Sequence, residues 1–506
     1  MIFYFSISII FTFVLFNLFG RTYALTQPDL RKRHDNATPQ FGGLVFGPLL
    51  ILVGWLLGIV PDWYLIGGMV SILLGGVDDI RHIPWQLKLA IQLVIAAYIA
   101  TIFWGYFDSI AFYNLSFSIT PVALLIIFLI WFIGIYNAVN LLDGLNGLAG
   151  GFMFLVCISV TLTGNGVFAQ LNLILAAFLL GFLVFNQNPS KMFMGDAGSL
   201  FLGFHIAVMP LLFTENIPFS SALNMTPFIL MASFLVADTT RVFITRLSVN
   251  KNPMSPDTIH FHHLVLQESG SYLGTLAVIY STTLVTVLFA AYNFFKPLTA
   301  NFMIAHLVLL MLFILTPPVQ TYVPLIRRAI KPLASWQNSN EVRTPFLPRT
   351  LFVVFLLLGL LTSIIIDSEF SCLLHWQNGL GILFMLIIIF FLRSDRMVIY
   401  IIQLGSIMVI AEAAWEIELG ILPKLFSTML IVSGIIFTLE RRMGTVIGKF
   451  AVLDLLIVLV SIGGIVLSQL GFALSSWLFV CLTSSWFGIS FIMRRTVFFN
   501  HVSAET

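Results

Sequence analysis

The chain has 506 residues, of which 59% are hydrophobic and 9% are charged, and its formal net charge at pH 7 is +2. A soluble domain averages about 25% charged residues and cannot use this much apolar surface. The composition excludes a soluble enzyme, a disulfide-rich scaffold and a disordered chain, and it indicates that the lipid bilayer is the solvent for most of the protein. The three cysteines lie far apart and predict neither a disulfide framework nor a zinc site.

Apolar runs long enough to cross a membrane follow one another along the chain. The first, at 1–20, has no basic region before it and is predicted to be a retained helix, not a cleaved signal peptide. Ten more are predicted at 41–60, 62–77, 87–104, 121–138, 145–163, 167–185, 197–213, 224–244, 272–294 and 298–316. Six others follow a polar stretch, at 350–366, 377–392, 397–414, 424–439, 450–470 and 472–493. The sequence thus predicts an all-α polytopic membrane protein with about 17 transmembrane helices.

The placement of basic residues predicts the orientation of these spans. With the N-terminus outside, 22 of the 24 Lys and Arg residues fall in cytoplasmic segments, and only Lys296 and Lys424 fall outside. Cytoplasmic loops carry such an excess, so the C-terminus is predicted to be cytoplasmic. The pattern divides the chain into a membrane domain at 1–316, a cytoplasmic polar linker at 317–349 and a C-terminal membrane extension at 350–506, whose role no motif indicates.

Polar clusters stand at the predicted cytoplasmic ends of the spans, where they are candidates for function because lipid makes such groups costly. A basic segment at 31–34, before residues 38–43, lies on the same side. The first cluster contains Asp78 and Asp79, which on a helix point about 100° apart and are expected to have different tasks. One would face a site while the other orients a neighbour, and Lys88 would supply a phosphate-binding charge. The alternative is that the two carboxylates cap a helix end.

A second cluster has polar residues at every third position, namely Asn137, Asn140, Asp143 and Asn146. On a helix this spacing keeps side chains on one broad face, and the glycines at 144 and 147 would then end the helix and let a ligand approach the backbone. The pattern predicts a binding surface for a polar ligand or an ion. A polar seam between packed helices is the alternative.

Two further clusters complete the set. Asp196 lies between Gly195 and Gly198 and suits Mg²⁺, which binds one or two protein ligands plus substrate phosphates; the alternative is an N-cap. The histidines at 260, 262 and 263 lack the further ligands that zinc requires and favour contact with phosphate or diphosphate over a solvated polar loop. Acidic groups for a cation, cationic groups for phosphate and a membrane face together indicate phosphoryl transfer from a cytosolic donor to a lipid acceptor.

These motifs, in this order over roughly residues 1–316, resemble the polyprenyl-phosphate N-acetylhexosamine-1-phosphate transferase family, of the glycosyltransferase 4 type. The resemblance implies a bacterial cytoplasmic-membrane enzyme whose site faces the cytoplasm. It would transfer a sugar 1-phosphate from a UDP-N-acetylhexosamine to undecaprenyl phosphate, releasing UMP and starting lipid-linked cell-surface glycan synthesis. The implied cofactor is Mg²⁺, with Mn²⁺ as the alternative. The expected partners are both substrates, membrane lipid, and glycan-assembly proteins or a second copy of the chain, with no nucleic acid.

The resemblance also implies a role for each motif residue. Catalysis would involve Asp78, Asp79, Lys88 and Asp143, and the metal would be held by Asp196 and Asn140. Phe193 matches an aromatic residue that stacks on uracil. The substrate-binding residues would be Asn137, Asn140, Asn146, Phe193, His260, His262 and His263.

Two positions depart from the family pattern. Asn146 stands where most bacterial members carry aspartate, and Thr258 stands where many carry arginine, with Arg246 or Lys251 as candidate replacements. The His-x-His-His form favours the branch that transfers GlcNAc-1-phosphate over the branch acting on UDP-MurNAc-pentapeptide, which is the alternative. An inactive membrane scaffold and a secondary transporter are the rival classes, since neither would catalyse the transfer.

Overall fold

A computed structural model describes residues 2–19, 25–26, 38–163, 166–187, 190–215, 222–252, 258–316, 324 and 452–469. The chain forms two compact units, one made of Phe11–Ala334 and the other of Met1–Ile10 with Ser335–Thr506. Every predicted site residue lies in the first unit. The basic segment at 31–34 and five of the six predicted C-terminal spans lie outside the described residues.

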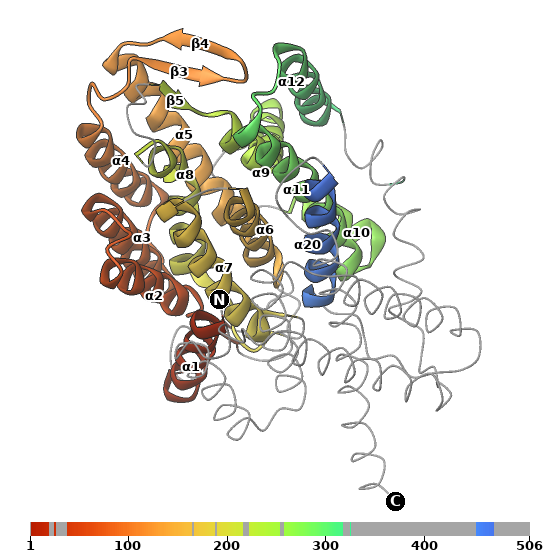
Figure 1. The fold of residues 1–506 in the computed structure, drawn as a ribbon. Helices are drawn as coiled ribbons and strands as arrows, with labels where there is room; N and C mark the ends of the chain where they lie inside the picture. The colour runs from red at the N-terminus through yellow and green to blue at the C-terminus, as the bar shows by residue number, and fades with distance from the viewer. Residues whose placement is uncertain are drawn as a thin grey trace, which may run out of the picture. The chain divides into compact units, whose positions relative to one another are not determined.

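The described residues are mostly helical (Figure 1). In chain order the first helices are α1 (Ile2–Phe19), α2 (Gly43–Leu56), α3 (Asp62–Ile80), α4 (Trp85–Ile102), α5 (Pro121–Leu142) and α6 (Leu148–Thr163). They are followed by α7 (Gly166–Asn186), α8 (Gly195–Glu215), α9 (Thr226–Ser248), α10 (Phe261–Ser269), α11 (Tyr272–Phe295), α12 (Ala300–Leu315) and α20 (Val452–Gln469). All eleven spans predicted up to residue 316 coincide with helices, and α20 coincides with the one predicted at 450–470.

Seven of the described helices are long and apolar enough to cross a membrane, namely α3, α4, α5, α7, α8, α9 and α11. The shorter apolar helices include α1, α2, α6 and α12. These helices support a polytopic membrane protein. The total of about 17 spans and the orientation of the two termini stay predictions.

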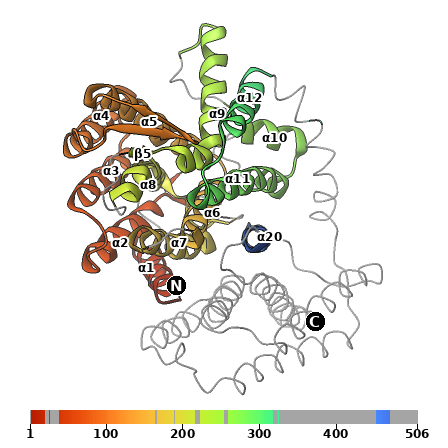
Figure 2. The same ribbon diagram turned by 45° about the horizontal axis from the view of Figure 1, so that its top comes forward.

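Helix α8 is the centre of the first unit, and nearly all of its residues are buried. Helices α2, α3 and α5 pack against it (Figure 2), while α6 packs against α7 and α11, and α9 against α11 and α12. Within this core, His205 of α8 contacts the Tyr64 hydroxyl at 2.7 Å and the Asn172 amide oxygen at 3.2 Å. Because its neighbours enclose it, α8 can hold a polar residue at its first turn in a fixed place.

Short strands lie at both ends of the unit. Strand β3 (Ser109–Phe112) pairs antiparallel with β4 (Leu115–Ser118) and parallel with β5 (Ala222–Asn224), which precedes α9. A second small sheet pairs β1 (Leu25–Thr26) with β2 (Thr38–Pro39). The three-stranded sheet joins the loops between α4 and α5 and between α8 and α9 (Figure 1). These loops follow the C-terminal ends of α4 and α8, whereas Lys88 and Asp196 are near the N-terminal ends of the same helices.

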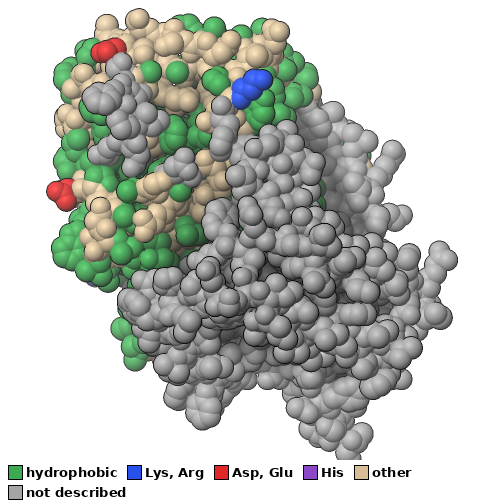
Figure 3. All heavy atoms as spheres, viewed as in Figure 1, with side chains coloured by type: hydrophobic (Ala, Val, Ile, Leu, Met, Phe, Trp, Pro, Cys, Tyr) green, Lys and Arg blue, Asp and Glu red, His purple; other side chains and the backbone are tan. Residues whose placement is uncertain are grey.

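The described surface of the first unit is largely apolar. Hydrophobic side chains cover much of the face in Figure 3, where charged side chains appear at only a few described points. Val94, Ile130 and Leu315 are 69%, 70% and 68% exposed. Such outward apolar side chains on α4, α5 and α12 are what a lipid environment favours.

Candidate active site

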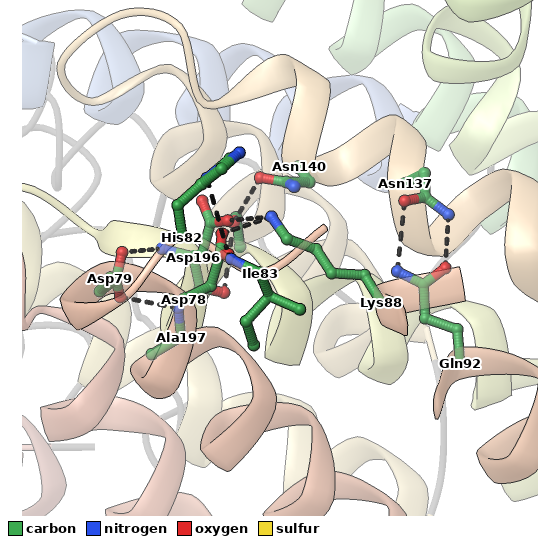
Figure 4. A network of polar contacts seen from close by, with 11 residues as sticks. Asp78, Asp79, His82, Ile83, Lys88, Gln92, Asn137, Asn140, Asp196 and Ala197 are labelled. Atoms are coloured by element: carbon green, nitrogen blue, oxygen red, sulfur yellow. Dashed lines mark hydrogen bonds and ion pairs between the residues drawn. The ribbon is translucent and has the colours of Figure 1, made fainter. Parts of the chain in front are cut away.

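The C-terminal end of α3 and the N-terminal ends of α4 and α8 bring two carboxylates onto one ammonium group (Figure 4). Lys88 Nζ donates to Asp78 Oδ2 and, at 3.1 Å, to Asp196 Oδ2. The other oxygen of Asp78 accepts the Ile83 amide at 2.6 Å. The Asp78 side chain is only 6% exposed and that of Lys88 17%, whereas Asp196 is 31% exposed. Residues far apart in the sequence therefore form one charged group with an opening at Asp196.

Asp79 has a different role from its neighbour. Its Oδ1 accepts the Asp196 amide at 2.8 Å and its Oδ2 accepts the Ala197 amide at 3.1 Å, so it caps the first turn of α8 from another helix. Gly195 has φ = 75° and a Cβ there would lie 2.6 Å from Asp79 Oδ2, so glycine suits both its conformation and the contact. Asp79 holds the backbone of Asp196 in place through these two hydrogen bonds. Its catalytic role stays a prediction.

The asparagines of the second cluster, Asn137 and Asn140, contact different helices. The Asn140 amide oxygen accepts the Ser199 hydroxyl at 2.9 Å, which places Asn140 beside the first turns of α8. Asn137 pairs with Gln92 of α4 through two hydrogen bonds of 2.8 and 3.2 Å. The geometry at Asn137 favours the helix-packing seam that the sequence left as an alternative. Neither Gln92 nor Ser199 was among the predicted site residues.

The predicted continuous polar face ends early, because α5 stops at Leu142 and Asp143 is its C-cap. Asp143 and Asn146 therefore lie in the loop before α6, not on the helix. The backbone oxygen of Asn146 accepts the Tyr272 hydroxyl. Gly144 packs directly on the histidine motif, since a Cβ on it would lie 2.3 Å from His262 Nε2 and 3.2 Å from His263 Nε2.

Phe193 belongs to a backbone junction just before α8. Its amide donates to the Pro39 oxygen at 2.9 Å, and its own oxygen accepts the Gly42 amide at 3.0 Å. The ring is partly exposed. The junction fixes residues 38–43 beside the start of α8, while stacking on a uracil ring stays a prediction.

The histidine motif rests on a buried carboxylate of α9. Asp238 accepts from His260 Nδ1 at 3.0 Å, from an Arg241 guanidinium nitrogen at 2.7 Å and from the Phe261 amide at 3.0 Å. His262 is fully buried, and this desolvation lowers the pKa of its imidazole to about 3. His262 is therefore neutral near pH 7.

The sequence prediction missed Asp238 and Arg241. The available signal was an Asp and an Arg at i and i+3 in an otherwise apolar span, because such paired charges are rare in lipid. Of the predicted replacements for the arginine missing at Thr258, Lys251 is exposed and Arg246 is a buried residue of α9, and both stay predictions. It is Arg241 that shares a carboxylate with His260.

The charge balance fits a divalent cation. Asp78 and Asp196 bring two carboxylates to one ammonium, and Asp79 adds a third carboxyl group at the backbone of the same turn of α8. No group of three or more metal-ligating His, Cys, Asp or Glu side chains occurs among the described residues. Magnesium suits this composition, since it binds through one or two carboxylates and takes its other ligands from water and phosphate. Asp196, the most exposed of the ion-paired group, is the best placed to contact it, with the Asn140 amide close by through Ser199.

Comparison with known proteins matches residues 63–214 to glycosyl transferase family 4. The chain is 34% identical over 274 residues to a probable undecaprenyl-phosphate N-acetylglucosaminyl 1-phosphate transferase of Bacillus subtilis, covering 51% of this chain and 74% of that one. It is 30% identical over 279 residues to the undecaprenyl-phosphate alpha-N-acetylglucosaminyl 1-phosphate transferase of Thermotoga maritima, covering 55% and 84%. The Escherichia coli K12 protein of that same name is 27% identical over 284 residues, covering 52% and 75%.

Proposed function

The chain belongs to glycosyl transferase family 4, and we propose that it transfers N-acetylglucosamine 1-phosphate from a UDP-sugar to undecaprenyl phosphate and releases UMP. The similar proteins of B. subtilis and T. maritima carry this acceptor and this sugar in their names. The single observation that carries the proposal is the convergence of Asp78, Lys88 and Asp196 at one end of a bundle of apolar helices. Phosphate recognition and a lipid-facing surface meet there.

In the proposed reaction, an oxygen of the lipid phosphate attacks the phosphorus that bears the sugar, and the bond to the UMP oxygen breaks. The acceptor is already anionic at neutral pH, so the protein has mainly to position it and to offset charge. Lys88 reduces the repulsion between the acceptor phosphate and the donor diphosphate, and Asp78 holds the Lys88 ammonium in place. Asp79 fixes Asp196 by capping α8.

We propose Mg²⁺ as the cofactor, held by Asp196 with Asn140 in support. When bound, it would neutralise charge on the donor diphosphate and on the leaving UMP. The protein's own contribution is a fixed first turn of α8. Asp79 accepts hydrogen bonds from the backbone amides of Asp196 and Ala197 and so orients Asp196. The partly exposed Asp196 carboxylate then faces the ligand.

The decisive experiment measures UMP release from UDP-GlcNAc by the purified protein with undecaprenyl phosphate, with and without Mg²⁺. We expect release to require both the lipid and the metal. A folded protein that releases no UMP from any UDP-N-acetylhexosamine would favour an inactive scaffold instead. A panel of UDP-sugars in the same assay would separate GlcNAc from the MurNAc-pentapeptide donor.

The Asp196→Ala variant tests the site directly. Losing this carboxylate should remove Mg²⁺-dependent turnover without unfolding the protein, because the backbone amide that Asp79 caps remains. Ser233→Ala on α9 is the control for loss of a polar side chain, since Ser233 is buried and contacts His306 instead of the site residues. Retained turnover in Asp196→Ala would contradict the assignment.

A further inference from the structure

Asp238 is the hub of a buried group that the proposed reaction has not yet used. Asp238, Arg241 and His260 are 5%, 4% and 4% exposed, and they join the middle of α9 to the start of α10. Arg241 also donates to the Ile259 oxygen at 2.7 Å. Burying the Asp238 carboxylate costs desolvation free energy even with three hydrogen-bond donors. We expect such a cost where the charge holds other side chains in a fixed arrangement.

Several nitrogen atoms of this group have no hydrogen-bond partner among the described residues, although they are buried. They are Arg241 Nε, His260 Nε2 and both ring nitrogens of His262. The His260 and His262 rings lie nearly parallel, with centroids 5.9 Å apart. Buried polar atoms are nearly always paired, so a set of unpaired nitrogens at one place indicates a polar ligand that hydrogen-bonds to them.

The group lies next to the site already described. His262 and His263 contact Gly144, which lies in the loop just after α5, the helix that carries Asn140 near its end. Asn140 in turn contacts Ser199 of α8. A ligand held near Asp196 and extending along the α5–α6 loop therefore meets the histidine motif, as a nucleotide-sugar diphosphate would.

We propose that Asp238 is the positioning residue of the donor site, and that it holds Arg241 and His260 so that both bind the diphosphate of the UDP-sugar. This inference rests on the proposed function and adds two residues to it. Arg241 then supplies the cation that is missing at Thr258.

The chemistry of the contact explains why a carboxylate is needed. An ionised carboxylate only accepts, so His260 carries a proton on Nδ1 and its Nε2 points away from Asp238. When Nε2 also takes a proton to donate to a phosphate oxygen, the Asp238 charge offsets the imidazolium. Asparagine would keep the size of the side chain but remove the negative charge that offsets the imidazolium.

The test compares Asp238→Asn with the wild-type protein in the UMP-release assay, and it measures the KM for each substrate separately. We expect the KM for UDP-GlcNAc to rise by about tenfold or more, the range seen when a supporting carboxylate behind a ligand-binding histidine is lost. The KM for undecaprenyl phosphate should stay within about twofold. Asp238→Glu, which restores the charge, should recover part of the donor affinity.

Direct binding of UDP-GlcNAc to the purified variants, measured by titration calorimetry, covers the case in which Asp238→Asn is too slow to assay. Ser233→Ala on the same helix serves as the control and should bind the donor like the wild type. Unchanged donor affinity in Asp238→Asn, or an equal rise in both KM values, would overturn the inference while the wild-type activity stands. An inactive wild type that binds no donor would overturn the proposed function itself and this inference with it.

Discussion

The two adjacent aspartates of α3 make contacts of different kinds, and single substitutions should separate them. Asp78→Asn removes the charge that holds Lys88, so we expect kcat to fall by about 100-fold, as when one electrostatic contact to the reacting phosphates is lost. Its unfolding temperature should change little. Asp79→Asn replaces one of the two acceptors that cap α8 and should cost about 1 kcal/mol of stability as well as activity. Thermal unfolding in detergent and UMP release measure both effects; equal stability of the two variants would contradict the division.

His262 predicts how stability depends on pH. Its pKa is lowered by burial from 6.5 to about 3, so the folded protein keeps it neutral where the unfolded chain protonates it. The stability it contributes is full above pH 6.5 and is lost progressively as the pH falls toward 3, by up to about 1.4 kcal/mol per pH unit. His262→Phe should therefore lose less stability than the wild type between about pH 7 and about pH 5. Unfolding temperatures across this range test the difference; parallel curves for both proteins would argue against a buried neutral His262.

At this scale the sequence located Asp78, Lys88, Asp196 and the histidines, because charge is conspicuous in an apolar chain. It could not distinguish Asp78 from Asp79, since their tasks depend on where α8 begins. It also could not show that Asn137 is paired with Gln92, because the partner lies on another helix. Such pairings are tertiary facts that spacing alone does not contain.

Among the elements, α3 and α4, which carry Asp78 and Lys88 at their ends, form an apolar groove between them. It has a volume of about 260 Å³ and only apolar lining atoms, and it includes Val70 of α3 with Ala90 and Val94 of α4. Ile91 also lines the groove and follows Lys88 by three residues, on the same side of α4, so we expect the chain of a lipid whose phosphate is at Lys88 to extend into the groove. We expect Ala90→Trp to raise the KM for undecaprenyl phosphate by about threefold to tenfold, since each lost apolar CH₂ contact is worth about 0.8 kcal/mol.

The control for Ala90→Trp is a tryptophan on the exposed apolar surface outside the groove. Ile130→Trp on α5 should leave both KM values unchanged, because Ile130 is 70% exposed and does not line the groove. The KM for UDP-GlcNAc serves as the internal reference in both variants. An unchanged KM for undecaprenyl phosphate in the Ala90→Trp variant would place the polyprenyl chain elsewhere.

The helices were more predictable than the strands and the short helix α10. Hydropathy marks a span over some 20 residues, so the predicted limits lie close to those of α2 through α9 and of α11 and α12. The strands have two to four residues, and the pairing of β3 with β5 joins segments more than 100 residues apart. Helix α10 is too short and too polar to stand out, although Gly270 in the left-handed conformation ends it. Long-range pairing and short elements leave too little local signal.

For the whole molecule, the structure places the charged site and the three-stranded sheet at opposite ends of the helical bundle (Figure 1). The placement of Lys and Arg predicts that the end with Asp78 and Asp196 is cytoplasmic. The tip of the β3–β4 hairpin, at Asn114, would then be on the outer side, and Arg81 between α3 and α4 on the cytoplasmic side. Both residues are exposed, so a single cysteine at either position can report which side it occupies.

We expect Asn114→Cys to react with a membrane-impermeant maleimide in intact spheroplasts, and Arg81→Cys to react only after permeabilisation. Cys157 is buried and can stay, whereas Cys372 and Cys481 are replaced by serine because they lie outside the described residues. UMP release by each variant confirms that it is folded. The reverse labelling pattern would put the site on the side without a UDP-sugar supply, and the orientation from charge would be wrong. The predicted pattern would place donor binding in the cytoplasm, where the nucleotide-sugar is made, with the lipid acceptor reaching the same site from the bilayer.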